Sequence, residues 1–128
     1  MSKLLFFELS EKVLDAAFTI HKAVGPGFLE HAYEEAICIE LKANKIPFNR
    51  QKVFTLEYKG NVIGSYVADI VISGKIILEL KSCTTITKNM EAQLLNYLHV
   101  SGVQVGYVIN FRNRLLEWKR FVMQPGPP

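Results

Sequence analysis

Apolar residues recur at helical spacing in the first third of the chain. Between residues 10 and 24 they lie three or four positions apart, and Ser10 is of the type that caps a helix N-terminus. The GPG stretch at 25–27 predicts where this helix ends. A second helix is expected over about 29–43, closed by Asn44 and a nearby proline. The pattern therefore predicts two consecutive helices separated by a short turn.

Beyond residue 50 the period of the apolar positions falls to two. The segment QKVFTLEYKGN (51–61) alternates as a half-buried strand does and ends in a turn. The next two strands, 62–72 and 75–81, are almost continuously apolar, which is typical of strands covered on both faces. The remaining chain predicts a helix over 88–101, capped by the preceding threonine, and strands over 103–111 and 114–123. The order of elements predicts an α/β fold with a mixed central sheet flanked by helices.

Three ionisable side chains, Asp69, Glu79 and Lys81, interrupt the two apolar strands. Burial of an unpaired charge costs on the order of several kcal/mol, so these residues either form ion pairs at solvent-facing strand ends or form a site. Glu79 and Lys81 are two positions apart and share a face of their strand. Asp69 joins that face if residues 72 and 76 pair across a three-residue loop. A two-residue loop without a bulge would place it on the other face.

Two carboxylates beside an ammonium group suit one particular chemistry. Carboxylate oxygens hold hard divalent cations such as Mg²⁺, and a bound cation lowers the pKa of one of its waters. A nearby lysine stabilises negative charge on a phosphate or handles the proton of that water. These are the groups that a metal-dependent phosphodiesterase needs, so the three residues are candidates for such a site.

Further motifs accompany these residues in a fixed order along the chain. GFLEHAY (27–33) matches the pattern GxxExxY, the three ionisable residues form D-x(9)-E-x-K, and QLLNY (93–97) is similar to the Q-x-x-x-Y motif of RecB-like exonucleases. The segments YKG and GYVINF also fit the GxxExxY pattern. D-x(9)-E-x-K alone is a weak signal, but the joint occurrence and order of the motifs is specific. Over about residues 10–122, the chain resembles the GxxExxY family of the PD-(D/E)XK nuclease superfamily, in its RecB-like branch.

This resemblance implies a fold and a set of metal ligands. The fold would be a nuclease-like αβββαβ core with an extra N-terminal helix, in a single domain over 1–128 whose last residues, 123–128, form a tail. The cofactor would be Mg²⁺ or Mn²⁺. By the same resemblance the metal ligands would be Asp69, Glu79, Glu30 and the backbone carbonyl of Leu80.

The resemblance also implies roles for three other side chains. Lys81 would be the catalytic lysine, and Gln93 and Tyr97 would point at the site or at substrate phosphate, since residues four apart share a helix face. Simpler roles stay open for several of these residues. Glu30 is also an acid at a helix start, where the helix dipole favours it. Gln93 and Tyr97 could equally be a residue that makes an interhelical hydrogen bond and a core aromatic. Tyr33 is expected to be a packing residue.

The chain departs from the family pattern at two positions. Val67 stands where the family commonly has an arginine, and Met90 stands where it commonly has a histidine. Two functions therefore remain in competition. The first is a metal-dependent nuclease that hydrolyses DNA, or alternatively RNA, through a metal-activated water. The second is a catalytically weak or inactive module of the same fold that binds nucleic acid or serves in assembly.

Composition indicates the compartment and the class of partner, but it does not distinguish between these two functions. The 128 residues carry a formal net charge of +3, which is compatible with a nucleic-acid partner, DNA in the first instance. The two cysteines match no metal-ligand spacing, and no apolar run is long enough to span a membrane, so we expect a reduced, cytoplasmic protein without a signal peptide. A chain this small would derive specificity from a homo-oligomer or a partner protein.

Overall fold

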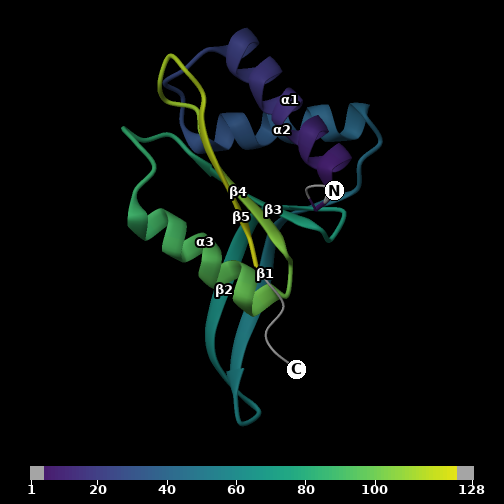
Figure 1. Cartoon of the computed structure of the whole chain (residues 1–128), viewed down its shortest axis with the longest axis vertical. Coiled ribbons are helices and arrows are strands. Elements are labelled where there is room, and N and C mark those ends of the chain that lie inside the picture. The colour runs from purple at the N-terminus through teal and green to yellow at the C-terminus, as the bar shows by residue number, and fades with distance from the viewer. Residues whose placement is uncertain (1–4, 124–128) are drawn as a thin grey trace.

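The computed structural model describes residues 5–123, which form three helices and one five-stranded sheet (Figure 1). The predicted order of elements and the mixed α/β class are confirmed. Of the predicted tail, only Met123 belongs to the described residues. The helices are α1 (Phe7–Val24), α2 (Glu30–Ala43) and α3 (Lys88–Ser101), and the strands are β1 (Phe48–Tyr58), β2 (Asn61–Ile72), β3 (Ile76–Lys81), β4 (Val105–Asn110) and β5 (Glu117–Val122).

The sheet has the strand order β1-β2-β3-β4-β5. Strands β1 to β3 form an antiparallel meander, β3 and β4 are parallel, and β5 returns antiparallel to β4. The parallel pair requires a crossover, and α3 supplies it. Because β3 and β4 run in the same direction, their carboxyl ends, Lys81 and Asn110, lie opposite each other at one edge of the sheet.

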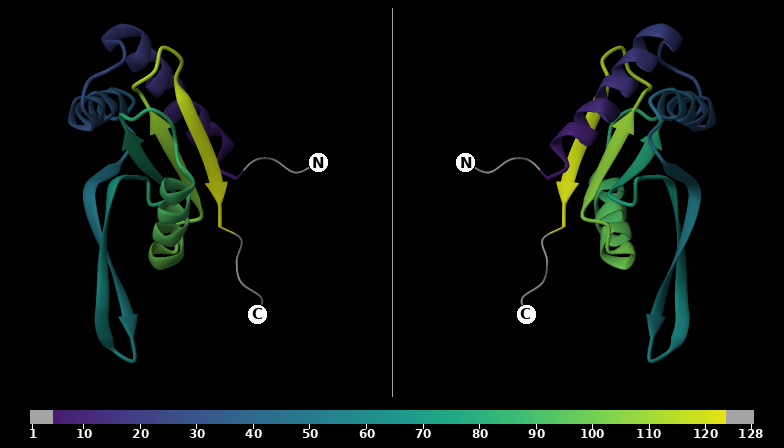
Figure 2. Two further views of the ribbon diagram at one scale, coloured as in Figure 1. Left: turned by 90° about the vertical axis from the view of Figure 1, so that its left-hand side faces the viewer. Right: turned by 90° about the vertical axis from the view of Figure 1, so that its right-hand side faces the viewer.

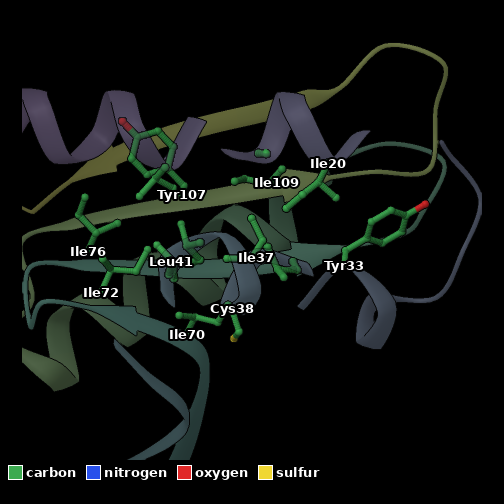
Figure 3. Close-up of a cluster of buried hydrophobic side chains, with 14 of the residues drawn as sticks. Ile20, Tyr33, Ile37, Cys38, Leu41, Ile70, Ile72, Ile76, Tyr107 and Ile109 are labelled. Carbon is green, nitrogen blue, oxygen red and sulfur yellow. The ribbon is translucent and has the colours of Figure 1, made fainter. Parts of the chain in front are cut away.

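Helices cover both faces of the central strands, as the apolar runs in β2 and β3 predict (Figure 2). Successive residues of β3 alternate between the two faces. Leu78 packs with α1 and α2, whereas Ile77 packs with Leu94 of α3. Figure 3 shows the larger core cluster, in which Ile37 and Leu41 of α2 meet strand residues such as Ile70.

The β1–β2 hairpin is longer than the core that it joins. Figure 1 shows its distal half extending below the helices, and Val53, Tyr58 and Val62 are exposed there. Near the core, Phe54 and Tyr66 instead pack against the cluster beneath α3. Within residues 5–123, none of the helices has the length and apolar character needed to span a membrane.

The register between β2 and β3 settles the question that the sequence left open. Ile72 pairs with Ile76 across the three-residue loop, and Ile70 pairs with Leu78. Ser73 and Gly74 both adopt left-handed backbone conformations, with φ of 52° and 66°, which lets the chain reverse within this loop. The same register brings Asp69 opposite Glu79.

One predicted cap is wrong and another is confirmed. Helix α1 begins at Phe7, so Ser10 lies within the first turn, where it is buried and where its hydroxyl has no hydrogen-bond partner among the described residues. Apolar side chains before Ser10, including Leu9, pack on the core and extend the helix toward the N-terminus. Thr87 caps α3 as expected, because its side chain accepts a 3.2 Å hydrogen bond from the backbone N–H of Met90.

Candidate active site

Asp69 and Glu79 bind each other's strand through their carboxylates. The backbone N–H of Asp69 donates to Oε2 of Glu79 at 3.0 Å, and the N–H of Leu80 donates to Oδ2 of Asp69 at 2.8 Å. These bonds take the place of ladder bonds beyond the last pair of β2 and β3, Ile70 with Leu78. The two carboxylates are therefore held side by side where the strands part.

Burial makes this pair electrostatically costly. Glu79 is only 6% exposed, and desolvation followed by the charge of Asp69 raises its pKa to about 8. The pKa of Asp69 is also raised, again chiefly by burial, and the ammonium group of Lys81 acts against the rise in both carboxyls. A divalent cation between the two acids would relieve this cost, and one or two carboxylates are the usual protein ligands of Mg²⁺. The donor set therefore fits such an ion.

Lys81 ends β3 on the same side of the strand as Glu79, since the two residues are two apart. Its backbone is fixed, because the N–H of Phe111 donates to the carbonyl of Lys81 at 3.0 Å. Its ammonium group forms no ion pair with any carboxylate of residues 5–123. A simple ion pair at a strand end does not describe this lysine, and its charge is available to a bound phosphate.

Glu30 does not join the acidic pair. It is the exposed first residue of α2, and its Oε1 accepts a 3.3 Å hydrogen bond from the N–H of Ser82. Among residues 5–123, no three His, Cys, Asp or Glu side chains converge as a set of metal ligands. Glu30 thus lies beside the residue that follows Lys81, and its role as a ligand remains a prediction.

Glu34, one turn later on α2, is a buried acid that the sequence reasoning missed. It is only 7% exposed, and its charge contributes to the raised pKa of both Asp69 and Glu79. Arg50 donates to Oε2 of Glu34 through Nη2 at 2.6 Å, and Gln51 donates to Oε1 at 2.7 Å. Gln51 has a left-handed φ of 48° within β1. The spacing of four from Glu30 was a usable signal, because residues four apart share a helix face.

Gln93 and Tyr97 form the pair that their spacing predicts. Nε2 of Gln93 donates to the hydroxyl of Tyr97 at 3.2 Å, so this bond lies within α3 and is not the interhelical bond considered as an alternative. Tyr97 is buried in edge-to-face contact with Tyr66, with 5.5 Å between ring centroids. Burial raises the pKa of Tyr97, and the charges of Glu79 and Asp69 raise it further, so this ring lies on the side of the sheet where the acids are. Gln93 is exposed.

A buried network of polar side chains, which the sequence did not predict, fixes the position of the chain that follows Lys81. Asn110 is fully buried; its amide donates to the carbonyl of Cys83 and to Glu117, both at 2.9 Å, and its oxygen accepts from the N–H of Cys83. Glu117 also accepts from the hydroxyl of Thr85 and from the N–H of Ile86. These bonds hold the β3–α3 loop against the end of β4. A polar residue ending an apolar strand was the only sequence signal.

The two departures from the family pattern leave apolar side chains near this region. Val67 is exposed on β2 and pairs with Val53 of β1. Met90 packs on the core beneath α3, with its sulfur 4.0 Å from that of Cys83. Neither side chain can donate a hydrogen bond to a phosphate.

The solved structures that share this fold include the following two. The protein titled "Crystal structure of SSO0001" matches with a TM-score of 0.58 and 16% identity over 75% of this chain and 50% of that one. An alkaline exonuclease, LHK-Exo from Laribacter hongkongensis, matches with a TM-score of 0.52 and 11% identity over 73% of this chain and 56% of that one. This chain thus spans only about half the length of each. Both likenesses show the fold alone.

A search among curated proteins finds no match to this chain. The model of one protein family, described as the PD-(D/E)XK nuclease superfamily, matches residues 7–121. That match covers α1 to β4 completely and β5 up to Phe121, and it includes the two strands that carry the acids and the lysine. The chain belongs to the PD-(D/E)XK nuclease superfamily.

Proposed function

We propose that this protein is a metal-dependent nuclease that hydrolyses phosphodiester bonds in DNA, or alternatively in RNA. The observation that carries the proposal is the pair of adjacent carboxylates, buried Glu79 and half-buried Asp69, with Lys81 unpaired beside them. A structural role alone does not account for these two neighbouring acids, because their repulsion and desolvation oppose folding. Membership of a nuclease superfamily supports the same conclusion.

Mg²⁺ or Mn²⁺ would be held by Asp69, Glu79 and the carbonyl of Leu80, with Glu30 as an additional carboxylate. When bound, the ion would activate a water and offset charge on the phosphoryl oxygens. Asp69 and Glu79 each commit one oxygen to the opposite strand, which fixes the direction of the other. Lys81 stabilises the negative charge that develops on the phosphate. Gln93, exposed and bonded to Tyr97, contacts the substrate from α3.

The glycine and the tyrosine of the GxxExxY motif have structural roles in this protein. These roles support the proposal that the chain belongs to that family and to the RecB-like branch. Tyr33 is buried, accepts a hydrogen bond from the N–H of Phe28 at 3.0 Å and donates to the carbonyl of Gly25 at 2.8 Å. Its ring stacks on Phe111 with 4.3 Å between centroids. Gly27 adopts a φ of 94°, which favours glycine. The glycine and tyrosine therefore shape the turn that sets Glu30 beside Ser82.

A binding or assembly module without catalysis is the competing function. The absence of the arginine and histidine at positions 67 and 90, and the separation of Glu30 from the acidic pair, favour it. The nuclease proposal takes nucleic acid as the partner and the cytoplasm as the compartment, and a homo-oligomer or a partner protein would add specificity.

Metal binding and cleavage distinguish the two functions in one set of variants. We expect Mg²⁺ or Mn²⁺ to raise the melting temperature of the wild type, because the ion binds the native state. Asp69→Ala and Glu79→Ala should each abolish that rise. Lys81→Ala should keep it while losing cleavage of single- and double-stranded DNA and RNA, since Lys81 acts on transition-state charge. A wild type without a metal-dependent shift and without cleavage would favour the binding module.

A further inference from the structure

Three loops meet beyond the carboxyl ends of β3 and β4. They are the α1–α2 turn (25–29), the β3–α3 loop (82–87) and the β4–β5 loop (111–116), and Figure 1 shows them at the same end of the molecule. The hydroxyl of Ser82 donates to the carbonyl of Phe28. The amide of Asn113 donates to the carbonyl of Thr84 at 2.9 Å. We call this group of residues the loop cluster.

Phe28 stands out in the loop cluster because its backbone is held firmly while its ring is exposed. Its N–H donates to the buried hydroxyl of Tyr33, and its carbonyl accepts from Ser82, the residue after Lys81. The side chain is nevertheless 53% exposed. The ring makes a T-shaped contact with Tyr33, at 6.4 Å between centroids and with an angle of 68° between the ring planes. An aromatic residue anchored in this way is preorganised for a ligand.

The charges of the loop cluster suit a polyanion. Arg112 and Arg114 are exposed on the β4–β5 loop, and neither forms an ion pair with a carboxylate of residues 5–123. The backbone N–H of Arg112 is bound by Asn110, which also holds Cys83. The two arginines are thus tied to the loop that leaves Lys81.

The exposed apolar area is too small for a protein partner. The large exposed apolar residues of the loop cluster are Phe28, Leu29 and Leu115, whereas a stable protein interface buries about 800 Å² on each side. A single exposed ring beside unpaired arginines instead resembles the combination that binds single-stranded nucleic acid, in which bases stack on aromatic faces and cations follow the backbone.

We propose that Phe28 is a stacking platform for an unpaired nucleobase, and that the substrate presents a single-stranded segment to the loop cluster. This inference rests on the proposed nuclease function and adds the substrate class to it. The base lies on the ring of Phe28, and Arg112 and Arg114 contact the neighbouring phosphates. Stacking places the adjoining phosphodiester next to Ser82 and therefore next to Lys81.

Binding measurements on single-stranded oligonucleotides test the platform. Fluorescence anisotropy is measured with the Lys81→Ala protein, which should bind without cleaving, on a thymidine oligonucleotide and on an abasic strand of equal length. Phe28→Leu keeps an apolar side chain but removes the π face. We expect it to weaken binding of the thymidine strand roughly tenfold, as expected for the loss of one stacked base, and to leave the abasic strand unaffected. Phe28→Tyr should restore affinity.

The matched control is Phe18→Leu, because Phe18 is 49% exposed on α1 but is not part of the loop cluster. It should leave both affinities unchanged. Equal weakening of both strands by Phe28→Leu, or no weakening of either, would overturn the stacking platform while leaving a cleaving wild type as evidence for the nuclease. A wild type that neither binds nor cleaves any nucleic acid would overturn both proposals.

Discussion

Glu79 holds a carboxylate where a central strand normally carries an apolar side chain. Its neighbours in β3, Leu78 and Leu80, are fully buried core residues on the opposite face. The free-energy cost of burying this charged carboxylate is reflected in its pKa, which burial and the charge of Asp69 raise to about 8. A carboxyl whose pKa is higher in the folded than in the unfolded state stabilises the fold when protonated and loses that contribution as the pH rises.

Replacing Glu79 by glutamine should therefore stabilise the metal-free protein at high pH. The ordinary pKa is 4.5 and the folded value about 8, so the wild type in EDTA should lose stability between these two values. Glu79→Gln should show a flatter profile, and its melting temperature should exceed that of the wild type most clearly above pH 8. Thermal melts from pH 5 to 9 measure this. With Mg²⁺ present the order should reverse, because only the wild type binds the ion.

A second prediction at the scale of single residues concerns Glu30. If its exposed carboxylate adds to the metal pocket from beside Ser82, Glu30→Ala should reduce the metal-dependent rise in melting temperature without abolishing it. Melts in EDTA should hardly change, because the side chain is exposed. Glu57→Ala, on the distal part of β1, is the control. An unchanged metal response in Glu30→Ala would restrict Glu30 to its role at the start of the helix.

At the scale of elements, a close contact between α3 and β4 offers a test of how the helix packs on the sheet. A Cβ added to Gly106 would lie 2.8 Å from one methyl carbon of Leu94 and 3.1 Å from the other. Leu94 is fully buried, so it has little room to move. The glycine thus allows α3 to approach the sheet closely, and α3 carries Gln93 and Tyr97.

Gly106→Ala should destabilise the protein by about 1–3 kcal/mol through overpacking. Urea unfolding gives the free energy directly. Combining it with Leu94→Val, which removes a methylene at the point of contact, should cost less than the sum of the two single changes, because the two positions share one space. If the two changes in unfolding free energy were strictly additive, α3 would be free to shift away from the added methyl group. Gly64→Ala is the control, since its nearest neighbour would be 3.7 Å away.

At the scale of the whole molecule, the sheet topology and the placement of cationic side chains bring positive charge to one end of the sheet. The parallel pair β3–β4 directs Lys81 and Asn110 to the same edge, where the loop cluster adds its arginines. The formal net charge of +3 is modest, so nucleic-acid affinity should depend on where the cations lie.

Affinity for a single strand should fall steeply with salt, because each neutralised phosphate releases counterions. Arg112→Gln with Arg114→Gln should lower the slope of log affinity against log salt by about 1.4, since each phosphate that an arginine neutralises adds about 0.7 to that slope. Anisotropy titrations between low and physiological salt measure the slope. Lys45→Gln with Lys59→Gln, which removes the same charge elsewhere on the surface, should leave it almost unchanged.

Local patterns in the sequence determined the elements of this protein and much of its candidate site. Hydrophobic period reports which face of each element is buried, and this depends on neighbours close in the chain. The order of the elements, the cap at Thr87 and the order of the motifs were therefore predictable. The start of α1 was not predictable: the expected cap at Ser10 is wrong, because Leu9 and apolar residues before it pack on the core and extend α1 toward the N-terminus.

Only the tertiary structure decided how distant residues meet. Two loop lengths were compatible with the sequence between β2 and β3, and the observed three-residue loop brings Asp69 opposite Glu79. The placement of α2 brings buried Glu34, which the motifs do not include, into the electrostatic range of that pair. Such contacts depend on how whole elements pack, since a shift of one residue or one helical turn exchanges the side chains that meet while preserving the local pattern.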